Sequence, residues 1–267
     1  MDLFKLIILS IIQGITEILP ISSSGHLILF KTILNIEYQG LDLEIILHFG
    51  SLLAVILFYK KDLITLLKSS FLYLFSKNKI QHLYEFNLLK CLILSTLITG
   101  IVGLLLNGFI EKFLSNIMLL PFSFLLTSIL IFLFSDKTEN KSLNSINLKD
   151  AIFIGLFQIL GLIPGVSRSG STIIGSKILK LDYKSSIKYS YLLFIPITLS
   201  SFILKSIEFF NEPKLIYPFY YYIISIVIVF CLTLISLSFI NKIIKKNTLK
   251  YFSYYLLILS LTIVLFL

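Results

Sequence analysis

Charged residues are scarce in this 267-residue sequence, where Asp, Glu, Lys and Arg make up 14%, against about a quarter in soluble domains. Hydrophobic residues make up 57%, and the mean hydropathy is +0.97. These values exclude an ordinary soluble domain. Cysteine is also scarce, because only Cys91 and Cys231 occur, both inside apolar stretches. A disulfide scaffold and a cysteine metal site are therefore excluded as well.

Long apolar stretches are present instead. A helix needs ~20 residues to cross a hydrocarbon core of ~30 Å. The stretches that suit this length are 41–59, 88–110, 117–134, 189–210, 217–240 and 251–267. The sequence therefore predicts an all-α polytopic membrane protein, with residues 1–267 forming a single membrane domain.

The net charge of +9 comes from lysines that gather in alternate connections between the spans. The connection after 41–59 contains Lys60, Lys61, Lys68, Lys77 and Lys79. A surplus of lysine on one side of a membrane marks the cytoplasmic side. The charge thus indicates topology rather than nucleic-acid binding, and both termini are expected outside the cytoplasmic membrane.

Two further apolar segments, about 4–35 and 151–180, are interrupted by breaks rich in Pro, Gly and Ser. The breaks read Pro20-Ile-Ser-Ser-Ser-Gly-His26 and Pro164-Gly-Val-Ser-Arg-Ser-Gly-Ser-Thr172. Helices stop at such residues, and irregular backbone at membrane depth survives only inside protein or beside a wet cavity. Both segments are therefore predicted to be re-entrant helix hairpins.

The two breaks match each other at a constant offset of 145 residues. Gln13, Ser22, Ser24 and Gly25 recur as Gln158, Ser167, Ser169 and Gly170. Each break precedes three spans, and an odd number of crossings starts the second half from the opposite face. The pattern predicts an inverted-topology repeat with halves of about 1–135 and 150–267, each one re-entrant hairpin plus three transmembrane helices. Such a repeat places one shared site between the breaks.

Arg168 is the only arginine among 23 Lys and Arg residues. Its planar fork holds phosphate oxygens bidentately, which a lysine does not. It stands between Ser167 and Ser169, and Ser/Gly-rich turns that enter a helix present free backbone N–H groups to phosphate. Arg168 is expected to bind phosphate; the alternative is a structural ion pair with a carboxylate.

Glu17 lies inside the first apolar hairpin, where an ionisable residue is costly and usually marks function. Gln13 stands one helical turn earlier, so both side chains share a helix face. This spacing suits a hard divalent cation, Mg²⁺ or Ca²⁺, which phosphate chemistry often recruits. The alternative is that Glu17 only pairs with Arg168.

His26 directly follows the three serines 22–24 and Gly25. It is a candidate general acid or base, or a nucleophile, although a lone His in an apolar stretch is more often a packed core residue. His48 stands four residues after Glu44, so the two could form a ligand pair, but both are expected to be packing or span-end residues and are left out of the site.

The two breaks resemble the motifs of undecaprenyl-diphosphatase, the bacitracin-resistance family of integral membrane phosphatases. Gln13-Gly-Ile-Thr-Glu17-Ile-Leu-Pro-Ile-Ser-Ser-Ser-Gly-His26 is similar to the first motif and 164–172 to the second. The resemblance implies hydrolysis of undecaprenyl diphosphate to undecaprenyl phosphate, which recycles the lipid carrier for cell-wall synthesis. It also implies a divalent cation, an inverted-repeat fold, catalysis near the outer face, and dimers.

Catalytic roles are carried over to Glu17, Ser23, His26 and Arg168. The resemblance and the N–H cradle together assign the substrate phosphate to Ser22, Ser167, Ser169, Gly170 and Thr172, and the metal to Glu17 and Gln13. The favoured mechanism has Ser23 attacking phosphorus with His26 as its base, with direct attack by His26 or by water left open.

Two rival functions share parts of this pattern. A second membrane phosphatase class has a histidine nucleophile and needs another histidine after its Ser-Arg pair, but no histidine follows Arg168. A lipid or small-molecule transporter is the alternative from another class, because inverted repeats and broken helices are typical of transporters.

Overall fold

A computed structural model describes residues 2–36, 41–114, 117–136, 139–211, 217–243 and 248–266. These residues form helices and no named strand, with one isolated bridge between Lys141 and Leu181. The long helices, in chain order, are α1 (Asp2–Thr16), α2 (Ser23–Ile33), α3 (Leu41–Phe58), α4 (Lys60–Phe75), α5 (Leu83–Leu114), α6 (Leu120–Phe134), α7 (Leu148–Ile159), α8 (Arg168–Ile178), α9 (Tyr183–Asn211), α10 (Phe219–Ile243) and α11 (Thr248–Phe266). Short 3₁₀ turns are η1 (Lys79–His82), η2 (Ile117–Leu119), η3 (Leu143–Ser145) and η4 (Leu160–Leu162).

The predicted spans correspond to α3, α5, α6, α9, α10 and α11. Five ranges of the described residues are long and apolar enough to cross a membrane: Lys79–Leu106, Ile117–Phe134, Tyr183–Ile207, Phe219–Lys242 and Thr248–Phe266. The all-α polytopic class is therefore confirmed. Leu267, the last residue of the predicted span 251–267, lies outside the described residues.

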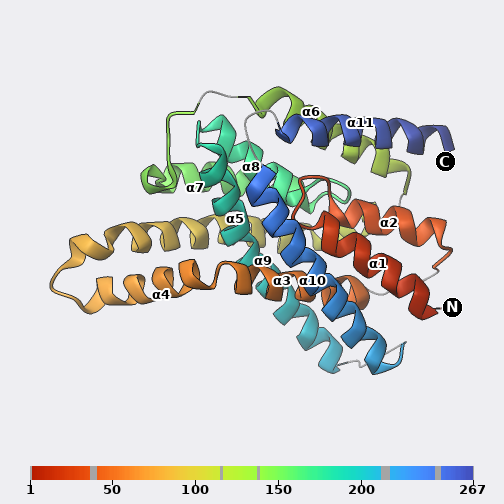
Figure 1. Ribbon diagram of the computed structural model, residues 1–267, viewed down its shortest axis with the longest axis horizontal. Coiled ribbons are helices and arrows are strands. Elements are labelled where there is room, and N and C mark those ends of the chain that lie inside the picture. The colour runs from red at the N-terminus through yellow and green to blue at the C-terminus, as the bar shows by residue number, and fades with distance from the viewer. Residues whose placement is uncertain are drawn as a thin grey trace.

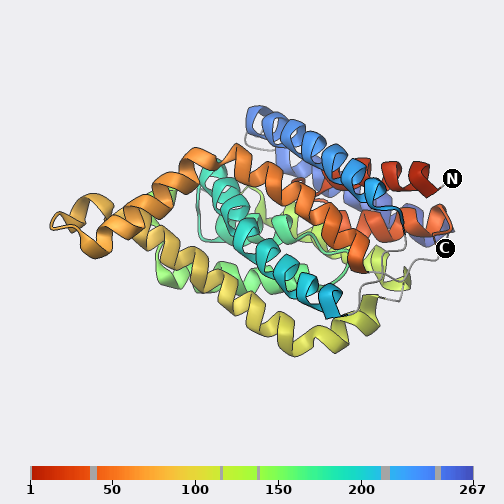
Figure 2. The same ribbon diagram turned by 90° about the horizontal axis from the view of Figure 1, so that it is seen from below.

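The span predicted at 41–59 is not a separate helix followed by a loop. It is the first part of a bent pair of helices, α3 and α4. The chain turns by 73° between Leu43–Phe58 and Lys60–Phe75. The bond from Tyr59 N–H to Val55 O at 3.0 Å closes the end of α3, and the bond from Leu63 N–H to Tyr59 O at 2.9 Å opens α4, so Tyr59 joins the two helices at the bend. The following lysine-rich connection is thus largely helical. Together, α4 and the start of α5 form a hairpin that projects from the body, at the opposite end from both termini (Figures 1 and 2).

Both predicted hairpins consist of two short helices joined by an irregular turn. The first runs from α1 to α2 and the second from α7 through η4 to α8. The first helix of each hairpin packs against a long helix of the other half of the chain: α1 contacts α10, and α7 contacts α5. This pairing agrees with a repeat; the inverted relation of the two halves and their boundaries stay predictions.

Two backbone carbonyls of the turn between α1 and α2 accept hydrogen bonds from side chains of distant helices. Tyr191 donates a hydrogen bond to Ile18 O at 3.0 Å, and Ser169 donates one to Leu19 O at 3.1 Å. An unpaired carbonyl at membrane depth would cost several kcal/mol. The protein interior therefore replaces water around this turn.

The two breaks touch each other at glycines. A Cβ added to Gly25 would lie 3.0 Å from Gly165 Cα and 2.7 Å from the Phe124 ring. Gly165 itself has a φ of +83°, a conformation that other L-residues rarely adopt. Only glycines let the backbones of the two breaks approach this closely, and this approach brings their side chains to one place.

The orientation can be tested with single cysteines introduced into a background in which Cys91 and Cys231 are replaced by alanine. Cysteines near Asn211 are expected to react with an impermeant thiol reagent in intact cells, whereas cysteines at Asn78 or Asn144 should react only after lysis. This follows from the lysine distribution. The reverse pattern would invert the predicted topology.

Candidate active site

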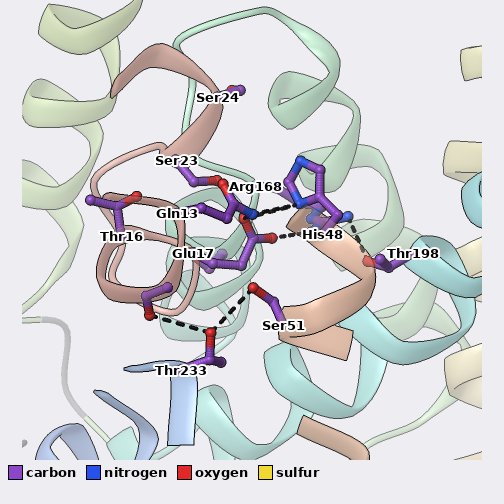
Figure 3. A network of polar contacts seen from close by, with 12 residues as sticks. Gln13, Thr16, Glu17, Ser23, Ser24, His48, Ser51, Arg168, Thr198 and Thr233 are labelled. Atoms are coloured by element: carbon purple, nitrogen blue, oxygen red, sulfur yellow. Dashed lines mark hydrogen bonds and ion pairs between the residues drawn. The ribbon is translucent and has the colours of Figure 1, made fainter. Parts of the chain in front are cut away.

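A cavity of about 180 Å³ lies between the two breaks. Its walls include Glu17 and Ser23 from the first break and Arg168 from the second, together with His48 from α3. Figure 3 shows these side chains pointing toward one another from different helices. Segments far apart in the sequence thus build a polar cavity where the two breaks meet.

The Glu17 carboxylate is the centre of the polar network in this cavity. Its side chain is 3% exposed. Oε1 accepts a hydrogen bond from the Arg168 guanidinium at 2.8 Å, and Oε2 accepts one from Ser23 Oγ at 2.5 Å. The Gln13 amide nitrogen donates to the same Oε2 at 2.7 Å. A carboxylate so held is ionised in place, because every neighbour named here stabilises the charged form.

Arg168 extends across the cavity from the first position of α8. One guanidinium nitrogen bonds Glu17, while the other donates to Thr198 Oγ1 at 3.2 Å. The guanidinium also lies over the Phe194 ring, 4.6 Å from its centroid. With 27% of its side chain exposed, Arg168 is oriented by protein partners yet still faces the cavity.

Two helix N-termini point at the cavity. Ser22 is the N-cap of α2, and its Oγ accepts the Gly25 N–H at 3.2 Å; Ser167 is the N-cap of α8, and its Oγ accepts the Gly170 N–H at 3.0 Å. The first N–H groups of each helix after its cap have no intrahelical acceptor. Helix N-termini with free N–H groups favour anions such as phosphate.

Corresponding positions in the two breaks carry different chemistry. At the offset of 145, Ser23 corresponds to Arg168 (23 + 145 = 168) and Glu17 to Leu162 (17 + 145 = 162). All of these residues line the cavity. One break therefore supplies the hydroxyl and the carboxylate, while the other supplies the guanidinium and an apolar wall.

The expected phosphate-binding residues divide into two groups. Ser22, Ser167, Ser169 and Thr172 line the cavity. Gly170 is not among the lining residues, and its N–H donates to Ser167 Oγ, so it shapes the turn and offers no free donor to phosphate. The Thr172 hydroxyl already contacts Ser190 Oγ at 2.6 Å.

His26 is not placed beside Ser23, contrary to the predicted pairing. Its Nδ1 lies 2.7 Å from Ser22 O and its Nε2 lies 2.7 Å from the Tyr255 hydroxyl. The ring is 3% exposed and packs edge-on against Phe124. Because a carbonyl only accepts, Nδ1 carries a proton and Nε2 accepts from Tyr255. His26 thus holds the first break in position from behind and does not reach the cavity.

This positioning role predicts different effects for two substitutions of His26. Asparagine keeps an N–H donor close to the Nδ1 position, so we expect His26→Asn to retain turnover within about threefold. His26→Ala should lose about tenfold, or about 1.4 kcal/mol, which lies within the range for one hydrogen bond. Steady-state kinetics of purified variants measure both. Equal losses of about 10²-fold or more in the two variants would instead indicate a general base.

His48 lines the cavity, contrary to the prediction that it is a packing or span-end residue. Its Nδ1 lies 3.1 Å from Glu17 Oε2 and 3.0 Å from Gln13 Nε2. Its supposed partner Glu44 instead pairs with Lys31 at 2.6 Å. The signal that singled out Glu17, an ionisable residue inside an apolar span, applied equally to His48.

The residues present fit a divalent cation, provided that amide and hydroxyl oxygens take part. The described residues contain no group of three or more His, Cys, Asp or Glu side chains that could hold a metal ion. However, Gln13 Oε1 is buried and has no hydrogen-bond partner in the described part of the chain. Mg²⁺ needs only one or two carboxylates when substrate phosphates complete its coordination, and Glu17 supplies one.

These features define a multi-pass α-helical membrane protein with a buried cavity suited to an anionic group. The chain matches the family model described as bacitracin resistance protein BacA over residues 6–262, and it belongs to this family. The resemblance inferred from the two breaks is therefore confirmed.

Three relatives illustrate the similarity. Undecaprenyl-diphosphatase 1 of Bacillus cereus is 35% identical over 98% of this chain and 97% of its own length. Undecaprenyl-diphosphatase 1 of Halalkalibacterium halodurans is 34% identical, over 97% and 96%. Undecaprenyl-diphosphatase of Oceanobacillus iheyensis is 32% identical, over 97% and 95%.

Proposed function

We propose that this protein hydrolyses undecaprenyl diphosphate to undecaprenyl phosphate and inorganic phosphate. The observation that carries the proposal is the Glu17–Arg168 pair, which joins the two breaks at 2.8 Å beside the Ser23 hydroxyl. The names of the relatives support the substrate. We further propose that the protein lies in the bacterial cytoplasmic membrane with its cavity opening outward, and that it recycles the lipid carrier for cell-wall synthesis. Dimer formation stays a prediction.

The diphosphate group suits the cavity between the two breaks. Arg168 and the N–H groups at the starts of α2 and α8 neutralise the phosphoryl oxygens. A smaller adjoining cavity of about 130 Å³ shares His48, Arg168 and Ser201 with the first and is also lined by Thr198, Ile45 and Phe202. The apolar side chains of Ile45 and Phe202 suit the first isoprene units, so the lipid chain leaves between α3 and α9 toward the bilayer.

Ser23 is the nucleophile in this proposal, and Glu17 takes the place expected for His26. As the bond from Ser23 Oγ to the terminal phosphorus forms, the Ser23 proton passes to Glu17 Oε2, 2.5 Å away. The bond to the bridging oxygen breaks, and the isoprenoid phosphate leaves. Water then attacks the phosphoserine phosphorus and leaves within the inorganic phosphate, which keeps the water protons, while Glu17 returns its proton to Ser23 Oγ. A serine hydroxyl needs such a base to be reactive at neutral pH.

Glu17 and Gln13 would hold the divalent cation. Such a cation, when bound, neutralises the charge that develops on the phosphoryl oxygens. The side chains themselves position the substrate, since phosphoryl transfer depends mostly on alignment and charge stabilisation.

The test is phosphate release by purified protein in detergent or vesicles, with undecaprenyl diphosphate as substrate. We expect stoichiometric inorganic phosphate and undecaprenyl phosphate. Lipid movement between leaflets without any phosphate release would contradict the proposal and favour the transporter alternative.

Arg168→Lys keeps the positive charge but loses the planar fork. We expect turnover to fall roughly 10²-fold, or ~3 kcal/mol, as when one preorganised oxyanion donor is removed. Lys188→Arg is the matched control, because Lys188 pairs with Asp62 away from the cavity, and its turnover should be unchanged. Near-normal turnover of folded Arg168→Lys would make Arg168 a structural ion-pair partner.

A further inference from the structure

His48 lies at the point where the proposed site would hold its cation. It comes from α3, 35 residues along the chain from Gln13, and 25% of its side chain is exposed. It borders both cavities. The reaction proposed above uses no group on this ring, so its place in the site has another explanation.

Three atoms from three side chains form a compact triangle. The Gln13 amide nitrogen is 2.7 Å from Glu17 Oε2 and 3.0 Å from His48 Nδ1, and the third edge, from Glu17 Oε2 to His48 Nδ1, is 3.1 Å. Adjacent ligands of an octahedral ion with bonds of about 2.1 Å stand about 3.0 Å apart. The triangle therefore has the size of one face of such a site.

The chemistry of the three groups also suits a cation. In the arrangement described, the Gln13 amide donates to both neighbours, so the His48 Nδ1 lone pair points into the triangle and the imidazole proton is on Nε2. Half a turn of the amide exchanges Nε2 with the unpartnered Oε1. With the imidazole proton on Nε2, three lone-pair atoms then face one another, and a cation bound to all three stabilises this arrangement.

We propose that His48 Nδ1, Glu17 Oε2 and the Gln13 amide oxygen form one face of a divalent-metal site, which makes its donor set mixed nitrogen and oxygen. The inference rests on the proposed function, which supplies the need for the cation. An imidazole nitrogen is a better ligand for transition-metal ions than for Ca²⁺, and carboxylate and amide oxygens suit Mn²⁺. Mn²⁺ therefore matches all three ligands. The site should accordingly bind Mn²⁺ more tightly than Ca²⁺, by about tenfold or more.

Electron spin-echo envelope modulation of bound Mn²⁺ tests the ligand directly, without turnover. Purified protein with a histidine-free affinity tag receives less than one equivalent of Mn²⁺. We expect ¹⁴N modulation from a directly bound imidazole. His48→Gln should lose the modulation and weaken Mn²⁺ binding by about tenfold or more, measured from the signal of free Mn²⁺. His82→Gln, changed in the 3₁₀ turn before α5, should retain both.

Bound Mn²⁺ without nitrogen modulation in the unaltered protein, or no Mn²⁺ binding, overturns the inference. Modulation that persists in His48→Gln does the same. Phosphate release with Mg²⁺ is measured on the same preparation, which separates the two proposals. Release without nitrogen modulation leaves the hydrolase standing and removes His48 from the metal, whereas modulation without release supports the ligand and contradicts the hydrolase.

Discussion

Replacing Glu17 with glutamine is expected to lower turnover by about 10³-fold or more, within the range for loss of a general base. Glutamine keeps the shape and an oxygen for Arg168, but it cannot take the Ser23 proton. It also removes the negative charge that faces the guanidinium at 2.8 Å. Single-turnover kinetics at saturating substrate measure the chemical step without the effect of weaker binding.

Glu44→Gln is the matched control for Glu17→Gln. Glu44 pairs with Lys31 at 2.6 Å. The control therefore also removes one carboxylate charge from an ion pair, in the same half of the chain as Glu17. Its turnover should stay within about threefold of the unaltered protein. The thermal unfolding midpoints of both variants establish that they are folded. A Glu17→Gln protein as active as Glu44→Gln would exclude Glu17 as the base.

Ser23→Ala is expected to reduce turnover by at least about 10³-fold, because the variant has no hydroxyl to form the phosphoenzyme. The residual rate would come from water attack supported by Arg168 and the helix N-termini, since positioning and charge stabilisation survive the substitution. Measurement of kcat and KM should show the loss in kcat, because Ser23 acts only on the chemical step.

Ser24→Ala provides the comparison for Ser23→Ala. Ser24 is the next residue in α2 and also lines the cavity, but its Oγ contacts Ser22 Oγ at 3.3 Å rather than Glu17. We expect a loss of no more than about tenfold, the scale of one weak hydrogen bond. Equal losses in both variants would contradict a special role for Ser23.

The sequence predicted the helical class and the two broken hairpins because both depend on local signals. The length of an apolar stretch predicts a membrane span, and a cluster of Pro, Gly and Ser predicts a break in a helix. It also brought Glu17 and Arg168 into one site, since matching breaks imply a shared centre. A structural ion pair and a role in the site are alternatives for these residues at the level of sequence. In the structure Glu17 and Arg168 form an ion pair and also line the cavity, so the two roles are compatible.

The histidines show where local reasoning fails. The spacing of Ser23 and His26 suggested neighbours on one helix, but tertiary packing decided otherwise, since the ring turns toward Phe124 and Tyr255. His48 lies in α3 and contacts Glu17 just after the end of α1. Such a contact between two separate segments cannot be predicted from residue spacing along the chain. The 73° bend after α3 was missed for a similar reason, because hydropathy averages over a window and carries no direction.

Rapid quenching of a reaction with substrate radiolabelled in its terminal phosphate tests the central claim most directly. Phosphoserine resists acid and is lost in alkali, whereas phosphohistidine behaves in the opposite way. The account predicts an acid-stable, alkali-labile protein adduct that forms and decays within one turnover and is absent from Ser23→Ala. An acid-labile, alkali-stable adduct that persists in Ser23→Ala and disappears in His26→Ala would contradict it.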